Sequence, residues 1–216
     1  MEILYEDKDI FVCIKPVGVS SENGMMQLIR EYLKDNTAYV GIIHRLDTAV
    51  SGVMVYAKTK SAAAKISGQI QNGDFKKEYY AVVSGCPEVK DGAFEDLLFK
   101  DSAKNKVFVV KNERKGVKRA VLEYSVYDTV NLDDNKISLL KIKLKTGRSH
   151  QIRVQFASRK MPLLGDGKYG SRYKCNIALF STAIKFIHPI THEEMHFSAL
   201  PENIFPFNKF AIKKEL

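Results

Sequence analysis

The chain has 216 residues, 45% hydrophobic and 27% charged, which is long enough to bury one substantial core and ordinary for a globular protein. No apolar run reaches the roughly 18 residues that a membrane helix needs, and the N-terminus opens acidic, without a signal-peptide pattern. These features argue against membrane-spanning and secreted proteins, and we expect a monomeric, cytoplasmic protein with one domain over residues 1–216.

The charge balance is strongly basic, because 34 Lys and Arg side chains outnumber 25 Asp and Glu side chains and give a net charge of +9. Such a field attracts polyanions, and phosphate neutralisation supplies most non-specific affinity for nucleic acids. The charge therefore favours a nucleic-acid partner over a merely soluble basic protein. The cysteines form no Cys-x-x-Cys pair, which argues against a disulfide framework and a cysteine-based zinc site.

The first part of the chain predicts two strands and two helices. Asp9–Ile14 is a short apolar run that stops at a Lys-Pro-Val-Gly turn, which is typical of a strand. Met25–Lys34 places apolar residues at helical spacing. Val53–Ala57 predicts a second strand, and Thr59 is expected to cap a helix that ends near Asn72-Gly73.

Strands dominate the rest of the chain, where β-branched and aromatic residues lie between turn signals. The expected strands are Lys77–Val83, Val107–Lys111, Lys118–Tyr127, Ile137–Lys145 and Ile177–Ile187. In Ile137–Lys145 apolar residues alternate with lysines, so one face should be buried while the lysines face water or phosphate. A short helix should start near Ser149. This pattern predicts an α+β fold with a mostly antiparallel mixed sheet and flanking helices.

The segment with the densest chemistry is His44-Arg45-Leu46-Asp47, which is followed by Ser51-Gly52 and a predicted strand. It places a carboxylate and a guanidinium two residues apart at the start of a loop of small residues. Functional groups concentrate on loops that rigid elements hold. By itself, however, a four-residue match is more often an ordinary surface turn.

Two later segments add aromatic and basic groups to this pattern. Lys76–Val83 places two tyrosines among basic residues on a strand, and Thr146–Phe156 places two arginines and a histidine beside a predicted helix start. In this order the three segments resemble the RluA-type pseudouridine synthase family. In that family an HRLD block, a K-x-Y strand and a GR-[ST]-HQ-[IL]-R block form one active site.

The resemblance extends over most of the chain. A Lys-Pro-x-Gly turn at Lys15–Gly18, a PxxGDxxYG loop at Pro162–Gly170 and an F-x-HP strand end at Phe186–Pro189 match further family blocks in order. Many members also carry a small N-terminal RNA-binding domain. Because Asp9–Ile14 already matches the first strand of the catalytic domain, we expect a short form without that additional domain.

The resemblance implies a role for each matched residue. Asp47 would be the catalytic aspartate, Arg153 would pair with it and orient it, and Tyr79 would stack on the target base. Arg45 would fill the gap that opens when the uridine leaves its stack. The other basic side chains of these blocks would contact RNA, namely His44, Arg148, His150, Lys77 and Lys15.

The implied reaction is the isomerisation of specific uridines in ribosomal or transfer RNA to pseudouridine. The C1′–N1 glycosidic bond breaks, the trapped base turns, and it reattaches through C5, with Asp47 acting either as nucleophile or as base on the sugar. No redox step or group donor takes part, so no cofactor and no metal are expected. The target atom cannot be reached inside a stack, which predicts base flipping onto an aromatic platform and exclusion of water.

Three alternatives stay open. A catalytically inactive RNA-binding protein of the same fold is favoured only by two departures from the family pattern, Val50 where Thr is usual and Gln155 where His is frequent. A zinc hydrolase would rest on the H-E-x-x-H match at His192–His196, but flanking prolines predict a hairpin instead of the required helix. A glycosidase that uses Asp47 would need a second carboxylate at the same bond, and none is obvious nearby in the sequence.

Two further segments are expected to be loops. Gly165–Gly170 fits G-x-G-x-x-G, but it lacks the strand and helix of a dinucleotide site and predicts a turn-rich loop. The basic stretch Lys111–Arg119 predicts a solvated hairpin, with contact to RNA phosphates as the less favoured alternative.

Overall fold

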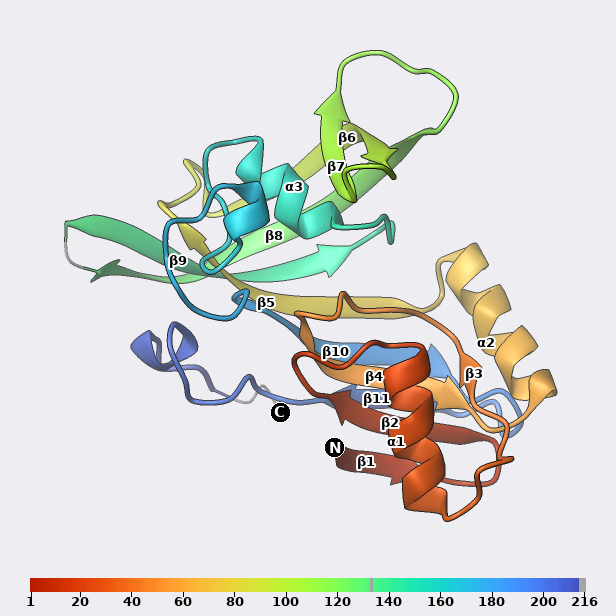
Figure 1. Cartoon of the computed structure of the whole chain (residues 1–216). Helices are drawn as coiled ribbons and strands as arrows, with labels where there is room; N and C mark the ends of the chain where they lie inside the picture. The colour runs from red at the N-terminus through yellow and green to blue at the C-terminus, as the bar shows by residue number, and fades with distance from the viewer. Residues whose placement is uncertain (133, 214–216) are drawn as a thin grey trace. The chain divides into compact units, whose positions relative to one another are not determined.

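The computed structural model describes residues 1–132 and 134–213, and the chain divides into two compact units (Figure 1). Unit 1 comprises Met1–Lys77 and Phe180–Pro201, and unit 2 comprises Glu78–Leu179 and the segment that begins at Glu202. The single domain expected over the whole chain stays a prediction. The α+β class with mostly antiparallel strands and flanking helices is confirmed.

Unit 1 is a small sheet with two helices packed against it. Its elements are β1 (Glu2–Glu6), β2 (Ile10–Lys15), α1 (Asn23–Leu33), β3 (Gly41–Ile42), β4 (Ser51–Ala57), α2 (Lys60–Asn72), β10 (Leu179–Ile187) and β11 (Glu194–Ser198). Strand β2 pairs antiparallel with β1 and β4, and β10 pairs antiparallel with β11. Strand β4 runs parallel to β10, and β3 pairs with its far end.

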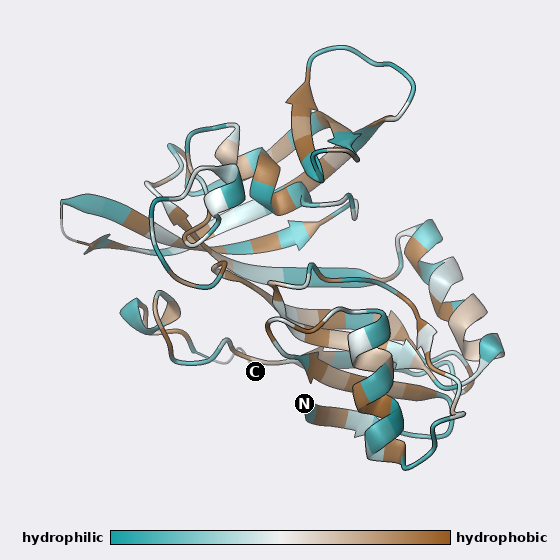
Figure 2. Ribbon diagram, viewed as in Figure 1, coloured by the Kyte–Doolittle hydropathy of each residue, from teal (hydrophilic) through white to brown (hydrophobic). Residues whose placement is uncertain are grey.

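Both faces of this sheet are covered, which explains why its central strands are continuous apolar runs rather than alternating ones. Every residue of Val53–Ala57 is buried. Val53 and Val55 share a core cluster with Ile66 of α2. On the neighbouring strand the ring of Phe11 lies 5.6 Å from the ring of Tyr32 on α1. Figure 2 shows the apolar residues along the strands, and Figure 1 shows α1 in front of β2 and β4.

The two helices predicted in unit 1 are confirmed. The hydroxyl of Thr59 accepts the N–H of Ala62 at 3.1 Å and caps α2, as the sequence predicts. At the other end Gly73 adopts φ +80°, the left-handed conformation in which glycine commonly ends a helix. Of the described helices, none combines the length and the apolar character that crossing a membrane requires.

Unit 2 consists of long antiparallel strands with one short helix on a face. Its elements are β5 (Lys76–Ser84), β6 (Asp91–Asp101), β7 (Lys106–Val110), β8 (Val117–Leu132), β9 (Asn135–Leu144), α3 (Gln151–Ala157) and the 3-10 helices η1 (Gly167–Tyr169) and η2 (Phe207–Lys209). The strand order is β5-β9-β8-β6-β7. Val154 of α3 packs against Leu98, Val107 and Ala120, which fixes the helix on the sheet.

The lysines of β9 have partners that the sequence analysis did not anticipate. Lys141 and Lys143 lie 3.1 and 3.7 Å from carboxylate oxygens of Glu78, on β5. Lys145, directly after the end of β9, lies 2.9 Å from Glu123 on β8. The predicted alternation is correct, but cross-strand ion pairs engage these lysines.

Strand β6 was missed because its acidic residues hide its strand character. Glu95 receives both the Nε and Nη2 groups of Arg119 on β8, and Asp96 pairs with Arg159 at 2.9 Å. Acidic residues are unfavourable in strands when they lack a partner. In β6 they pair with arginines that are distant in the sequence. The short strands β1 and β3 were missed as well, whereas β11 is the second strand of the predicted hairpin at His192–His196.

Candidate active site

Asp47 lies in the loop between β3 and β4 of unit 1, and backbone contacts of its neighbours hold this loop. The hydroxyl of Ser21 accepts the N–H of Leu46 at 3.0 Å and donates to the carbonyl oxygen of Leu46 at 2.7 Å. The N–H of Val50 donates to the carbonyl oxygen of Asp47 at 2.9 Å. The Asp47 side chain is half-buried, so the loop fixes its position without enclosing it.

The Ser51-Gly52 pair after this loop is explained by a close approach of two strands. Gly52 has φ +133°, and a Cβ atom there would collide with the backbone of Ser181 on β10. Only glycine fits this position. Gly52 therefore lets β4 begin beside β10 directly after the Asp47 loop.

Lys15 is buried beneath the Asp47 loop, and its expected contact with RNA stays a prediction. Its ammonium donates to the backbone carbonyls of Pro16, Val19 and Thr48 at 2.8, 2.7 and 3.3 Å. Burial lowers the pKa of Lys15 to about 8, and the charge of Asp47 opposes that shift. The ammonium therefore ties the Lys-Pro-Val-Gly turn to the residue that follows Asp47.

His44 also lies inside unit 1, with only 7% of its surface exposed. Its Nε2 accepts the N–H of Val55 at 3.2 Å, which places the proton of the neutral ring on Nδ1. Among the described residues this buried Nδ1 has no hydrogen-bond partner. Burial, together with the positive charge of Lys77, lowers the pKa of His44 to about 3. His44 is therefore a neutral interior side chain, and its expected contact with RNA stays a prediction.

Arg45 and Lys77 are the predicted RNA contacts of unit 1 that stay at least partly accessible. Arg45 donates to Glu22 at 2.8 Å, and the two side chains are 63% and 52% exposed. Lys77 is half-buried 5.8 Å from the ring centroid of Phe75, and burial lowers its pKa. Because an exposed ion pair contributes at most about 1 kcal/mol, Arg45 can exchange Glu22 for an RNA group at small cost.

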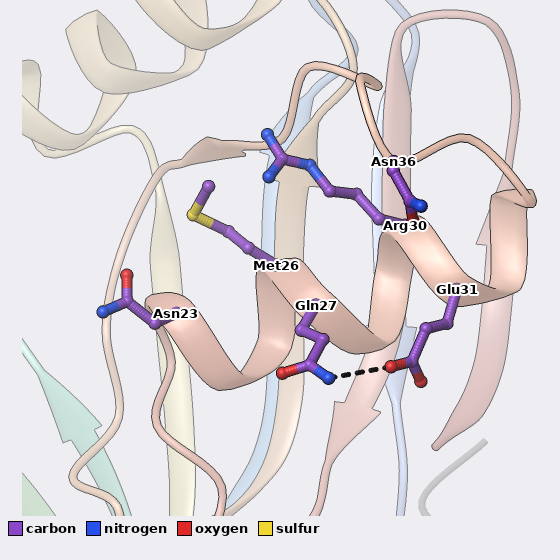
Figure 3. A pocket seen from close by; sticks show the side chains of 6 residues that line it. All are labelled: Asn23, Met26, Gln27, Arg30, Glu31 and Asn36. Carbon is purple, nitrogen blue, oxygen red and sulfur yellow. Dashed lines mark hydrogen bonds between the residues drawn. The ribbon is translucent and has the colours of Figure 1, made fainter.

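An open hollow lies beside α1, and Asn23, the residue after Glu22, is one of its lining residues. Figure 3 shows the side chains that line it, Asn23, Met26, Gln27, Arg30, Glu31 and Asn36. The Gln27 amide donates to Glu31 at 2.9 Å, and Arg30 Nε donates to the carbonyl oxygen of Ala38 at 3.0 Å. The residues predicted from the sequence do not line this hollow, so it is not part of the candidate site.

In unit 2, Tyr79 lies on β5 and is buried, with 5% exposed. The same strand holds the loop that follows α3, through two backbone hydrogen bonds of Val82. Its N–H donates to the carbonyl oxygen of Ala178 at 3.0 Å, and its carbonyl oxygen accepts the N–H of Leu164 at 2.9 Å. Strand β5 therefore carries the predicted stacking residue and fixes the neighbouring loop.

Arg153 of α3 has a buried partner that the sequence analysis missed. Its Nε and Nη2 groups donate to the two carboxylate oxygens of Asp166 at 2.6 and 2.8 Å. Arg153 is 6% exposed and Asp166 is 1% exposed, so this is a buried, bidentate ion pair. The only sequence signal was an acid directly after a glycine in the Pro162–Gly170 block, and nothing there ties that acid to α3.

Tyr169 connects three parts of unit 2 around this ion pair. Its hydroxyl accepts the N–H of Val107 on β7 at 2.9 Å and lies 2.9 Å from Nδ1 of His150. Its ring centroid lies 5.2 Å from the guanidinium carbon of Arg153. Of the RNA contacts predicted here, His150 is half-buried next to Tyr169, whereas Arg148 is exposed.

The two departures from the family pattern both lie in the interior. Val50 is buried, where an apolar side chain fits. Gln155 is fully buried, and its amide donates to Asp96 at 2.7 Å. Neither departure removes a group with a predicted chemical role, so neither favours the inactive alternative.

The H-E-x-x-H match forms a hairpin, as the flanking prolines predict. His192 lies in the turn with φ +62°, and His196 pairs with Lys185 across the β10–β11 hairpin. The two histidines therefore do not share the helix face on which zinc proteases bind their metal.

A group of metal-type ligands lies elsewhere in unit 1, where Asp7 and His188 are hydrogen-bonded and the buried Oδ2 of Asp9 has no partner among the described residues. The ligand atoms of Asp7, Asp9 and His188 lie within 4.8 Å of one another. Nδ1 of His188 accepts the N–H of Thr191 at 3.0 Å, which places the ring proton on Nε2, 2.9 Å from Asp7. Both ring nitrogens are engaged, so this histidine offers no lone pair to a metal ion.

Comparison with known proteins identifies the class of enzyme. Residues 9–158 match the RNA pseudouridylate synthase family. The chain is 33% identical to an uncharacterized RNA pseudouridine synthase of Aquifex aeolicus, over 91% of this chain and 68% of that protein. It is 32% identical to the ribosomal large subunit pseudouridine synthase D of Vibrio cholerae, over 92% of this chain and 67% of that protein. The chain therefore belongs to the RNA pseudouridylate synthase family.

Solved structures agree on the fold. The human RNA pseudouridylate synthase domain containing 1 superposes with a TM-score of 0.81 at 20% identity, covering 95% of this chain and 84% of that one. The human RNA pseudouridylate synthase domain containing 4 gives a TM-score of 0.76 at 22% identity, with 93% and 89% covered. The resemblance seen in the sequence is confirmed, and the protein is an RNA pseudouridine synthase, an isomerase.

Proposed function

We propose that the enzyme isomerises specific uridines in ribosomal or transfer RNA to pseudouridine, with Asp47 as its catalytic carboxylate. The family match carries this proposal, because it spans Asp47, Tyr79 and Arg153. Ribosomal RNA is the favoured substrate, since relatives named ribosomal large subunit pseudouridine synthase D align over most of the chain. Local structure supports the role of Asp47, which is half-buried on a loop anchored at Leu46 and Val50.

The proposed chemistry rearranges the uridine without net gain or loss of atoms. Asp47 acts on the ribose as nucleophile or as base, and the C1′–N1 bond breaks. The base turns in place, and C5 bonds to C1′. The hydrogen on C5 leaves to solvent, and N1 gains a proton. This balance calls for neither an oxidant nor a group donor.

The remaining roles are those that the family resemblance implies, and the chemistry of the side chains is consistent with them. Tyr79 stacks on the flipped base, which an aromatic ring can do for any nucleobase. Arg153 orients the carboxylate of Asp47. Arg45 takes the space that the uridine leaves, and its exposure together with the weak pairing to Glu22 supports this role. The net charge of +9 attracts the phosphate backbone to the protein.

The test is tritium release from RNA labelled at uridine C5, because only substitution at C5 frees that hydrogen. The wild-type chain is expected to release tritium with EDTA present and no metal added. Binding of RNA without release would favour the inactive RNA-binding alternative. An essential, stoichiometric metal would revive the zinc hydrolase, and release of free uracil would favour a glycosidase.

The particular RNA is found by mapping pseudouridines in cells with and without this protein. Ribosomal sites that vanish with the protein would support the favoured substrate, and loss confined to transfer RNA would correct it. The cytoplasmic location and the monomeric state expected from the sequence stay predictions.

A further inference from the structure

The strands β6, β7 and β8 of unit 2 have two faces that differ in what covers them. On one face Leu98 and Val107 are buried against α3. Because side chains alternate along a strand, the residues next to these point to the opposite, open face. On that face Phe99 lies between Phe108 of β7 and Val117 of β8, its register partners on the two sides.

The open face is apolar, whereas the solvated face of an antiparallel sheet ordinarily carries polar side chains. Its apolar side chains are all at least partly exposed, and Phe108 is 37% exposed. Figure 2 shows apolar residues along β6 and β7. Contiguous apolar surface of this kind marks an interaction site. We call this surface the β6–β8 platform and define it by its apolar members, Leu97, Phe99, Phe108, Val110 and Val117.

Basic side chains lie next to the aromatic rings of the platform. The ammonium of Lys106 lies 5.8 Å from the ring centroid of Phe108, and the guanidinium carbon of Arg114 lies 4.5 Å from that of Phe99. Residues 101–119, which form β7 and its flanks, include seven Lys and Arg residues but only two acids. Such an excess of positive charge attracts a polyanion. Charge complementarity therefore favours RNA over a second protein as the partner of this face.

An exposed aromatic ring beside cations on an open sheet is suited to unpaired bases. Sheets whose aromatic side chains stack bases are a recurring arrangement for binding single-stranded RNA. Every nucleobase has a π face, so stacking on Phe108 tolerates any sequence. A base inside a duplex is covered on both sides by its neighbours and cannot offer that face. The platform therefore fits a single-stranded stretch of RNA better than a duplex.

The platform is joined to the candidate site of unit 2 through Tyr169. The N–H of Val107 donates to the Tyr169 hydroxyl at 2.9 Å, and the ammonium of Lys106 lies 5.3 Å from the Tyr169 ring centroid. The same tyrosine contacts His150 and Arg153. Strand β7 thus places the edge of the platform beside residues with predicted roles in the reaction.

We propose that the β6–β8 platform binds unpaired nucleotides that flank the target uridine, with Phe108 as the ring on which a base stacks. The proposal rests on the proposed function, in which the substrate is RNA. It adds a surface for bases other than the target uridine, and the residues with predicted roles do not form this surface.

The experiment measures affinity for two fluorescein-labelled RNAs, a single-stranded oligouridylate and a duplex of the same length. Phe108→Leu keeps an apolar side chain but removes the ring, so it should weaken oligouridylate binding by about ten-fold and leave duplex affinity near wild type. Phe108→Tyr keeps the ring and should bind both RNAs like wild type. Tyr32→Leu is the control, because Tyr32 is an aromatic residue of α1 that is 49% exposed, and both affinities should stay near wild type.

Two results would overturn the proposal. Wild-type affinity of Phe108→Leu for the oligouridylate would leave the apolar face to a protein partner, and equal losses for the two RNAs would show that no base stacks on the ring. Because only affinity is measured, the proposed function is tested separately. A wild type that shows the expected affinities but releases no tritium would contradict the proposed function and leave the platform in place.

Photocrosslinking tests the same contact in the wild-type chain and does not depend on how a variant folds. An oligouridylate with uridine iodinated at C5 is expected to crosslink to a peptide that contains Phe108. Excess unlabelled oligouridylate should suppress this crosslink, and duplex RNA should not. Crosslinks confined to peptides outside the β6–β8 platform would overturn the proposal.

Discussion

The two groups at the centre of the proposed chemistry are held in different ways. Asp47 in unit 1 is half-buried, and the side chains of Ser21 and Lys15 anchor its loop by hydrogen bonds to the loop backbone. Arg153 in unit 2 is buried, and one bidentate side-chain ion pair with Asp166 fixes it. The anchoring of the first is distributed over several weak contacts, whereas that of the second is concentrated in one strong contact.

This difference has a physical reason. A carboxylate that acts on the substrate must stay accessible, so its position is set by the backbone and its surface is left open. A guanidinium that orients another group can be buried, provided that an anion compensates its charge. We therefore expect the loss of one contact in the unit 1 anchor to lower the free energy of unfolding only slightly. Loss of the ion pair that forms the unit 2 anchor should lower it much more.

The largest expected effect comes from breaking the concentrated anchor. Arg153→Met removes the cation that compensates the buried carboxylate of Asp166, and should lower the free energy of unfolding by about 3–5 kcal/mol. Arg153→Met/Asp166→Leu removes both charges and should recover most of this loss. Urea unfolding measures both variants. A double variant as unstable as the single one would show that the penalty is not an uncompensated charge.

Acid should destabilise the fold through His44, which is buried in unit 1. Its folded pKa of about 3 lies below the unfolded value near 6.5, so below pH 6.5 the unfolded chain binds a proton that the folded chain excludes. The free energy of unfolding should therefore fall with decreasing pH, by about 1–2 kcal/mol between pH 6.5 and 5 from this residue.

His44→Gln should lose this part of the pH dependence, and His196→Gln, an exposed histidine, should keep it. Urea unfolding at pH 5 and pH 7 gives the comparison. Identical pH dependence in wild type and His44→Gln would contradict the buried neutral state of His44.

A single contact of the distributed anchor should matter less. Ser21→Ala removes the hydroxyl that both accepts from and donates to the backbone of Leu46, and should cost about 1–2 kcal/mol. Thermal and urea unfolding would measure this loss, and a loss as large as that of Arg153→Met would contradict the contrast between the two anchors.

The smallest expected effect concerns RNA affinity. Glu22→Gln removes the exposed acid that pairs with Arg45, and should strengthen RNA binding by at most about five-fold, since such pairs contribute under about 1 kcal/mol. Glu31→Gln is the control, because Glu31 is an exposed acid on α1, the helix that begins directly after Glu22. Weaker binding in Glu22→Gln would mean that the acid positions Arg45 for RNA instead of competing for it.

The sequence predicts well what local patterns determine. The caps of α2 at Thr59 and Gly73 and the buried run Val53–Ala57 are confirmed, because a single helix end or strand carries its own signal. The burial of Lys15 could not be predicted, since the carbonyls that receive its ammonium belong to two separate turns. The Arg153–Asp166 pair was missed for the same reason, because a helix and a loop meet only in the folded unit.

The most direct test of the central claim compares Asp47→Asn with Asp74→Asn, an exposed acid in the connection between α2 and β5, in single-turnover tritium release. Asp47→Asn should abolish release while RNA affinity and unfolding stay near wild type, and Asp74→Asn should release tritium at the wild-type rate. Wild-type release by Asp47→Asn would contradict the assignment of Asp47 as the catalytic carboxylate.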